Sequence, residues 1–92
     1  MGLKIKTLAI HGSVWNNAEV RIEPASTKKE ETTTIDRKTS FQYRQKYNVF
    51  VKSDEGDFNY ESDFIIDIDK PVYEQCYTDI KSKKEFKNAI NI

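Results

Sequence analysis

Residues 58–68 read FNYESDFIIDI and carry the strongest strand pattern in the chain. Apolar and aromatic side chains fall mainly on even positions, and mostly polar or acidic ones fall between them. Because successive side chains of a strand point to opposite faces, this alternation predicts a strand with one buried face. The predicted buried set is Phe58, Tyr60, Phe64, Ile66 and Ile68, and the opposite set is Asn59, Glu61, Asp63 and Asp67.

The preceding segment alternates in the same way. We expect either one strand over Thr32–Lys52 or two strands divided near Gln45. Residues 53–57 read SDEGD, and Gly56 in this run can adopt a positive φ, which is typical of a tight turn. The pattern therefore predicts a hairpin between residues 47–52 and 58–68.

Two further strands are expected near the N-terminus. Residues 3–10 alternate but change phase near Thr7 and Leu8, which indicates a bulge or a twist. Residues 18–23 form the second strand, and we expect Pro24 to end it because proline has no N–H to donate to a ladder. Residues 26–31 are predicted to be a polar, mobile loop.

After residue 68 the apolar period changes to that of a helix. Asp69 can cap a helix and Pro71 suits its first turn. Ser82 and Glu85 have the spacing of a capping box and predict a second short helix. The first helix would bury Tyr73, Cys76, Tyr77 and Ile80, and the second would bury Phe86, Ala89 and Ile90.

These elements predict one α+β domain over residues 1–92, with the sheet in 1–68 and the helical segment in 69–92. The expected sheet is antiparallel, has four or five strands, and packs against one or two C-terminal helices. Strand order is left open, so the sheet can be an open sheet, a sandwich or barrel-like.

Composition narrows the classes of function. The chain has 15 basic and 15 acidic residues, so no net charge draws it to nucleic acid or to a membrane. Its single cysteine excludes an internal disulfide, and we expect a reducing compartment. Charge is segregated along the chain, because residues 54–69 contain seven acidic and no basic side chains. Such segregation favours either faces that pair within the fold or charge complementarity between subunits.

No residue pattern predicts chemistry. His11 lies beside Gly12 in a predicted turn without a second ligand or base nearby in sequence. Cys76 falls on the apolar helix stripe, where a thiol behaves as a small hydrophobe. The acidic run does not match the calcium-loop spacing, since its glycine comes too early. We therefore expect no enzymatic activity, no cofactor, no metal and no small-molecule substrate.

Surface residues supply the candidates for partner contact. Trp15, in a predicted loop, is either a lid on the core or an interface anchor. The other candidates are charged and are expected on the 26–31 loop or the outer face of the hairpin: Lys28, Lys29, Glu61, Asp63 and Asp67. Basic residues between Tyr43 and Tyr47 leave single-stranded nucleic acid as an alternative partner.

The C-terminal stretch YEQCY (73–77), with Ile80-Lys81, Glu85-Phe86 and the end AINI (89–92), resembles small proteins encoded in the tail-gene region of phages and prophages of Gram-positive bacteria. The strand AEVRIE (18–23) is also similar to that family. This chain has Cys76, Ile80 and Asn91 where the family typically has alanine, leucine and aspartate. Members are described as hypothetical or minor structural proteins, and the resemblance implies no catalytic residue.

The resemblance implies a non-enzymatic tail-region protein that acts through protein–protein contacts in a virion or its assembly. Its partners would be other phage proteins or further copies of itself. It would be located in the host cytoplasm and in the virion. The alternatives are a small phage-encoded inhibitor of a host protein and a single-stranded nucleic-acid-binding module.

Overall fold

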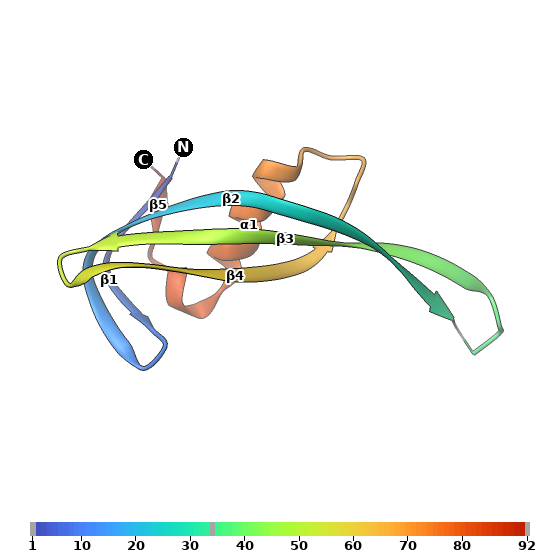
Figure 1. Ribbon diagram of the computed structural model, residues 1–92, viewed down its shortest axis with the longest axis horizontal. Helices are drawn as coiled ribbons and strands as arrows, with labels where there is room; N and C mark the ends of the chain where they lie inside the picture. The colour runs from blue at the N-terminus through green and yellow to red at the C-terminus, as the bar shows by residue number, and fades with distance from the viewer. Residues whose placement is uncertain (1, 34, 92) are drawn as a thin grey trace.

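The protein is a five-stranded antiparallel sheet in the order β4-β3-β2-β1-β5, with helical segments on one face (Figure 1). This computed structural model describes residues 2–33 and 35–91, so Ile92, in the stretch that carries the family resemblance, lies outside the described residues. The α+β class with an antiparallel sheet is confirmed, and the sheet is open. The elements are β1 (Leu3–Ile10), β2 (Ser13–Thr33), β3 (Thr39–Ser53), β4 (Gly56–Ile66), α1 (Val72–Ser82), the 3₁₀ turn η1 (Lys84–Phe86) and β5 (Ile90–Asn91).

The hydrophobic core lies between the inner face of the sheet and α1 with η1. Even-numbered residues 18–22 of β2 and odd-numbered residues 45–51 of β3 point inward, in keeping with the alternation of a strand. α1 adds one apolar stripe and η1 adds Phe86, which is 1% exposed. The buried hydrophobic set is Leu3, Ile5, Leu8, Ala18, Val20, Ile22, Tyr47, Val49, Val51, Ile66, Cys76, Tyr77, Ile80 and Phe86.

The β1–β2 hairpin changes its inward phase halfway along. Leu3 and Ile5 are buried at one end, and Leu8 is buried at the other. Asn17 marks the change, because its φ of 52° is in the left-handed region that asparagine tolerates better than most residues. The predicted phase change is thus confirmed, and it turns Trp15, which faces Leu8 across the ladder, onto Phe58 of β4.

The prediction that Pro24 ends the second strand is wrong. β2 continues to Thr33, with one bulge between Pro24 and Ser26. The main-chain N–H of Ile22 donates to the hydroxyl of Tyr77 at 3.3 Å, so it points away from β3. The main-chain nitrogen of Pro24, two residues later, also points away from β3. It does not face β1 either, because the pairing of β2 with β1 has already ended at Val20. Proline is tolerated there because no ladder hydrogen bond is lost.

Residues 26–31 are strand, and the prediction of a loop there is also wrong. They pair with residues 41–46 of β3, and the connection between the strands lies further on, near Ile35 and Arg37. β4 pairs with β3 only as far as Ile66, opposite Tyr43. Beyond that point β2 and β3 continue as a two-stranded ribbon. We call this ribbon, together with the adjoining Lys28 and Lys29, the arm (described residues 28–33 and 35–42). Figure 1 shows the arm reaching well past the body of the molecule.

β3 is one strand from Thr39 to Ser53, so of the two alternatives the one with a division near Gln45 is wrong. The side chain of Gln45 is 2% exposed, and it is satisfied because it accepts from the Thr27 hydroxyl and donates to the carbonyl of Lys46 at 2.8 Å. Ile68, predicted to be buried, is 52% exposed. β4 has ended at Ile66, and Asp67 accepts the N–H of Asp69 at 3.0 Å to form a turn.

α1 begins at Val72 with Pro71 as its cap residue, so Asp69 does not cap it. The predicted second helix is reduced to η1. The hydroxyl of Ser82 donates to the carbonyl of Asp79 at 2.6 Å, which leaves no capping box with Glu85. Ile90, expected to be buried, is 62% exposed because it lies in β5, paired with Lys4.

Candidate interaction surface

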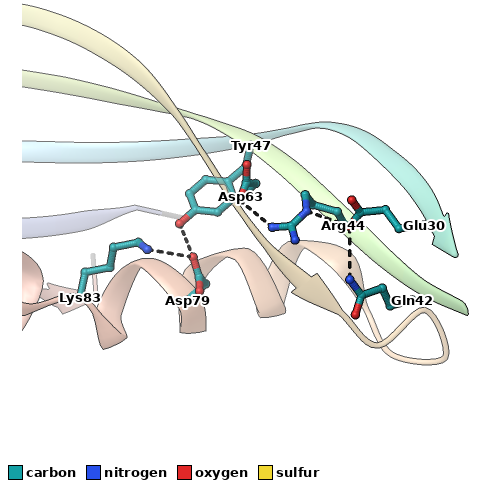
Figure 2. A network of polar contacts seen from close by, with 7 residues as sticks. All are labelled: Glu30, Gln42, Arg44, Tyr47, Asp63, Asp79 and Lys83. Carbon is teal, nitrogen blue, oxygen red and sulfur yellow. Dashed lines mark hydrogen bonds and ion pairs between the residues drawn. The ribbon is translucent and has the colours of Figure 1, made fainter. Parts of the chain in front are cut away.

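Arg44 holds the base of the arm to β4 (Figure 2). Its Nε donates to Glu30 on β2 at 2.9 Å, and its Nη1 donates to Asp63 on β4 at 3.0 Å. Gln42 adds a 3.4 Å contact to the same Glu30 oxygen. The hydrogen bonds to these two carboxylates raise the pKa of Arg44 above its ordinary value, and Glu30 has the larger effect. One guanidinium therefore joins three strands on the outer face, opposite α1.

The arm carries its own polar contacts but no hydrophobic core. Thr32 and Ser40 share a 2.6 Å hydroxyl contact near the tip. The ammonium of Lys29 lies 4.1 Å from the centre of the Phe41 ring, in cation–π geometry. Phe41 remains 55% exposed, and in the described residues 28–33 and 35–42 no side chain is buried. The arm thus presents an aromatic ring and mixed charges to solvent.

The predicted contact residues do not form one site. Lys28 and Lys29 lie on opposite faces of the arm, since they are adjacent on β2. Glu61 and Asp63 are on the outer face of β4, where Asp63 contacts Arg44. Asp67 shapes the turn after β4 and lies 3.8 Å from Lys70.

Trp15 lies far along the sheet from the arm and packs against the core. Its ring centre is 4.5 Å from that of Phe58, and His11 approaches Tyr60 at 4.9 Å, so the first hairpin bends over the inner face. Burial, with a smaller effect of Glu85, raises the pKa of the Tyr60 phenol. Neither Trp15 Nε1 nor the Tyr60 hydroxyl has a hydrogen-bond partner. These rings cover one end of the core.

A third surface feature is an open depression of ≈ 680 Å³ over Phe50 on the outer face. Arg21 lies 5.3 Å from the centre of the Phe50 ring. Glu19, Lys52 and Asp57 also line the depression, so its charges are balanced. Nothing in this lining selects an anionic or a cationic ligand.

Groups that could support chemistry are spread apart. Within residues 2–33 and 35–91, no three histidine, cysteine or carboxylate side chains gather as a metal site would require. Cys76 is fully buried, and burial, with a smaller effect of Asp79, raises the pKa of its thiol to about 11. A thiol with so high a pKa carries little thiolate near neutrality and is a poor nucleophile.

Among the described residues, no helix has the length and apolar character that a membrane span requires.

Comparison with protein-family models, curated proteins and solved structures finds no match to this chain.

Sequence reasoning missed Glu30, Phe41 and Arg44 as contact residues. Glu30 and Arg44 are 14 residues apart, a spacing without a periodic signal. They meet only because the β2–β3 register, including the bulge before Ser26, places Glu30 opposite Gln42. The sequence did carry one signal. Residues 28–52 hold seven basic and three acidic side chains, and this region pairs with the acidic 54–69 region through Arg44 and Asp63.

Proposed function

We propose that this chain is a non-enzymatic protein-binding module whose contact surface is the arm. The main support for this proposal is the elongated shape of the molecule. The Cα radius of gyration is 15.5 Å and the principal extents are 52 × 26 × 19 Å. A compact domain of this length would have a radius of gyration of about 12 Å. The excess comes from the arm, which lies outside the body that contains the core.

The composition of the arm supports a docking role. An isolated two-stranded ribbon is marginally stable in water, so a long ribbon without a core gains from a partner that covers it. Phe41 offers such a partner an aromatic side chain, and aromatic side chains are enriched among the residues that dominate binding energy. Ile35 at the tip is fully exposed and adds a second apolar contact.

The resemblance at residues 73–92 supports the biological setting of the proposal. We propose a tail-region phage protein that contacts other phage proteins or further copies of itself, in the host cytoplasm and in the virion. The arm would then dock on a neighbouring subunit, while the α1 side of the sheet keeps the body folded.

Site-directed photo-crosslinking tests the arm. A photoreactive phenylalanine analogue replaces Phe41 in one variant and Phe50, on the outer face of the body, in the control variant. We expect Phe41 to give a defined protein adduct in phage-infected cells and Phe50 to give much less. Adducts from position 50 in place of position 41 would contradict the arm as the contact surface.

Mass spectrometry of purified virions tests the setting separately. The proposal expects this chain in virions at a constant ratio to the tail proteins. Its absence from virions under all conditions would remove the structural version of the proposal, even if Phe41 gives an adduct inside the cell.

A further inference from the structure

The two edges of the sheet differ in length and regularity. β5 is two residues long and covers only Leu3 and Lys4 of β1, whereas β4 is eleven residues long. β4 pairs with β3 from Gly56 to Ile66 without a register shift, and its sequence contains neither proline nor lysine. Proline, lysine and bulges are the usual devices that protect an edge strand from pairing. β2, by contrast, has Pro24 and a bulge where it becomes an edge.

The outward main-chain groups of β4 can be identified from the ladder. The N–H of Ile22 donates to Tyr77, so the main-chain groups of Val49, directly opposite Ile22, face β4. Val49 therefore exchanges hydrogen bonds with its partner Tyr60. The alternate residues of β4 direct their N–H and C=O groups away from β3, toward the free edge: Asp57, Asn59, Glu61, Asp63 and Ile65.

The side chains around this edge define the partner. The outward-directed residues place three carboxylates on the outer face, and all five of their side chains are exposed. Asp57 faces Lys52 and Asp63 faces Lys46, whereas Glu61 faces Asn48, so of these three carboxylates Glu61 alone has no cation directly across the ladder. On the inner face the edge is lined by Phe58, Tyr60 and Phe64, which are partly buried. An added strand would therefore set alternate side chains against acids and the others against aromatic rings.

We infer that the β4 edge binds an extended segment of a partner protein that carries lysine or arginine at alternate positions and apolar residues between them. Main-chain hydrogen bonds to the edge would supply affinity. Glu61, with Asp57 and Asp63 on either side of it, would select the cationic partner. This surface is separate from the arm, since it is on the body between the β3–β4 turn and Ile66.

A second copy of β4 is a poor occupant. Antiparallel pairing of two β4 strands through their outward groups, centred on Glu61, would place Glu61 opposite Glu61. A shift by two residues in either direction would place Glu61 opposite Asp63, or Asp57 opposite Asp63. Like charges directly opposite each other destabilise a strand pair. Charge complementarity therefore favours a basic segment over a symmetric dimer.

The probe is a capped, fluorescein-labelled heptapeptide in which lysine and valine alternate, added to the full chain. Fluorescence anisotropy measures affinity, and amide chemical shifts map the site. We expect saturable binding that weakens as salt rises, with the largest shifts at Asp57, Asn59, Glu61 and Asp63. A matched peptide with glutamate in place of lysine should not bind. Equal binding of both peptides, or shifts confined to residues 28–42, would overturn the inference.

Two variants separate main-chain pairing from charge. Glu61→Pro removes an outward N–H without touching the β3 ladder, and Glu61→Lys keeps the N–H but reverses the charge. Each should weaken peptide binding at least about tenfold, with an unchanged thermal melt. Phe41→Ser should leave binding unchanged, so failure of the arm proposal and failure of this one are distinguishable. A dimer by light scattering that Glu61→Pro converts to monomer would identify a second copy as the occupant and overturn the inference.

Discussion

The hydroxyl of Tyr47 donates a 2.6 Å hydrogen bond to the carboxylate of Asp79, 32 residues further along the chain. Tyr47 is fully buried on β3, and Asp79 lies on α1, where the Lys83 ammonium approaches the same carboxylate oxygen at 3.7 Å (Figure 2). Burial, and after it the hydrogen bond to Asp79, raises the pKa of the Tyr47 phenol. The contact fixes the helix against the centre of the sheet.

Tyr47→Phe should lower the free energy of unfolding by about 1.5–3 kcal/mol, the range for a hydrogen bond to a charged group. The carboxylate of Asp79 would then keep only its longer contact with Lys83. Urea denaturation measures the effect. Tyr73→Phe is the control, because that hydroxyl makes a 3.4 Å contact with Tyr77 at a surface position. Equal losses in the two variants would show that the Asp79 contact contributes little.

Stability should fall at alkaline pH, in part because of Cys76. The pKa of this thiol is about 11 in the fold, against an ordinary value of 9.0. The unfolded chain therefore loses the proton first, so the contribution is fully present below pH 9 and is lost as pH rises through 11. Near pH 10 the loss is on the order of 1 kcal/mol.

Urea midpoints at pH 8, 9 and 10 check this for the native chain and for Cys76→Ala. The variant should start less stable but lose less between pH 8 and 10. Tyr77, whose pKa is raised to about 12 by burial and by Tyr73, should keep some alkaline sensitivity in both proteins. An identical pH dependence in both would contradict a role for the thiol.

Glycine substitutions should separate backbone strain from steric contact. A Cβ atom added at Gly12 or at Gly56 would meet no heavy atom within 4 Å, so any cost comes from the backbone. Gly12 has a φ of 76°, near the left-handed region, whereas Gly56 has a φ of 133°, where side chains are rarely tolerated. Gly56→Ala should therefore cost about 1–3 kcal/mol and more than Gly12→Ala, as thermal denaturation would show. The reverse order would refute the assignment to strain.

Loss of Arg44 should loosen the arm without unfolding the body. In Arg44→Ala, Glu30 and Asp63 lose their shared cation, so limited proteolysis should cut residues 28–42 faster while the thermal midpoint changes little. Arg44→Lys should be intermediate, because an ammonium lacks the planar fork that reaches both carboxylates. Arg21→Ala, which removes an exposed cation from the outer face, is the matched control. Unchanged cleavage in Arg44→Ala would mean that the arm is held by its ladder alone.

The sequence predicted the elements with regular alternation. The even-numbered face of β4 and the apolar stripe of α1 lie where their periods place them, with Ile68 and Tyr73 more exposed than expected. Ile68 lies two residues past the end of β4 and Tyr73 lies in the first turn of α1, where the core no longer covers them. The alternation in residues 3–10, which pair with the strand around Asn17, predicted a phase change. The resulting contact of Trp15 with Phe58 could not be predicted, because it depends on the neighbouring strands.

The length of β2 could not be read from local signals. Pro24 and the polar run after it have turn chemistry, and only the tertiary setting shows that this proline faces a strand edge with no ladder bond to lose. The bulge at Ala25 is equally invisible, since it is defined by pairing with β3. The Arg44 contacts depend on that register, so this part of the candidate surface could not be derived before the topology was known.

The ends of the described chain meet at one corner, because Leu3 pairs with Asn91. Figure 1 shows that corner on the opposite side of the body from the arm. A reporter or affinity tag fused at either terminus would therefore sit well away from residues 28–42. Joining the two termini through a short linker and opening the chain near Ile35 should likewise preserve the body. Circular permutation is therefore a practical way to make forms of this protein in which the two strands of the arm are no longer connected at the tip.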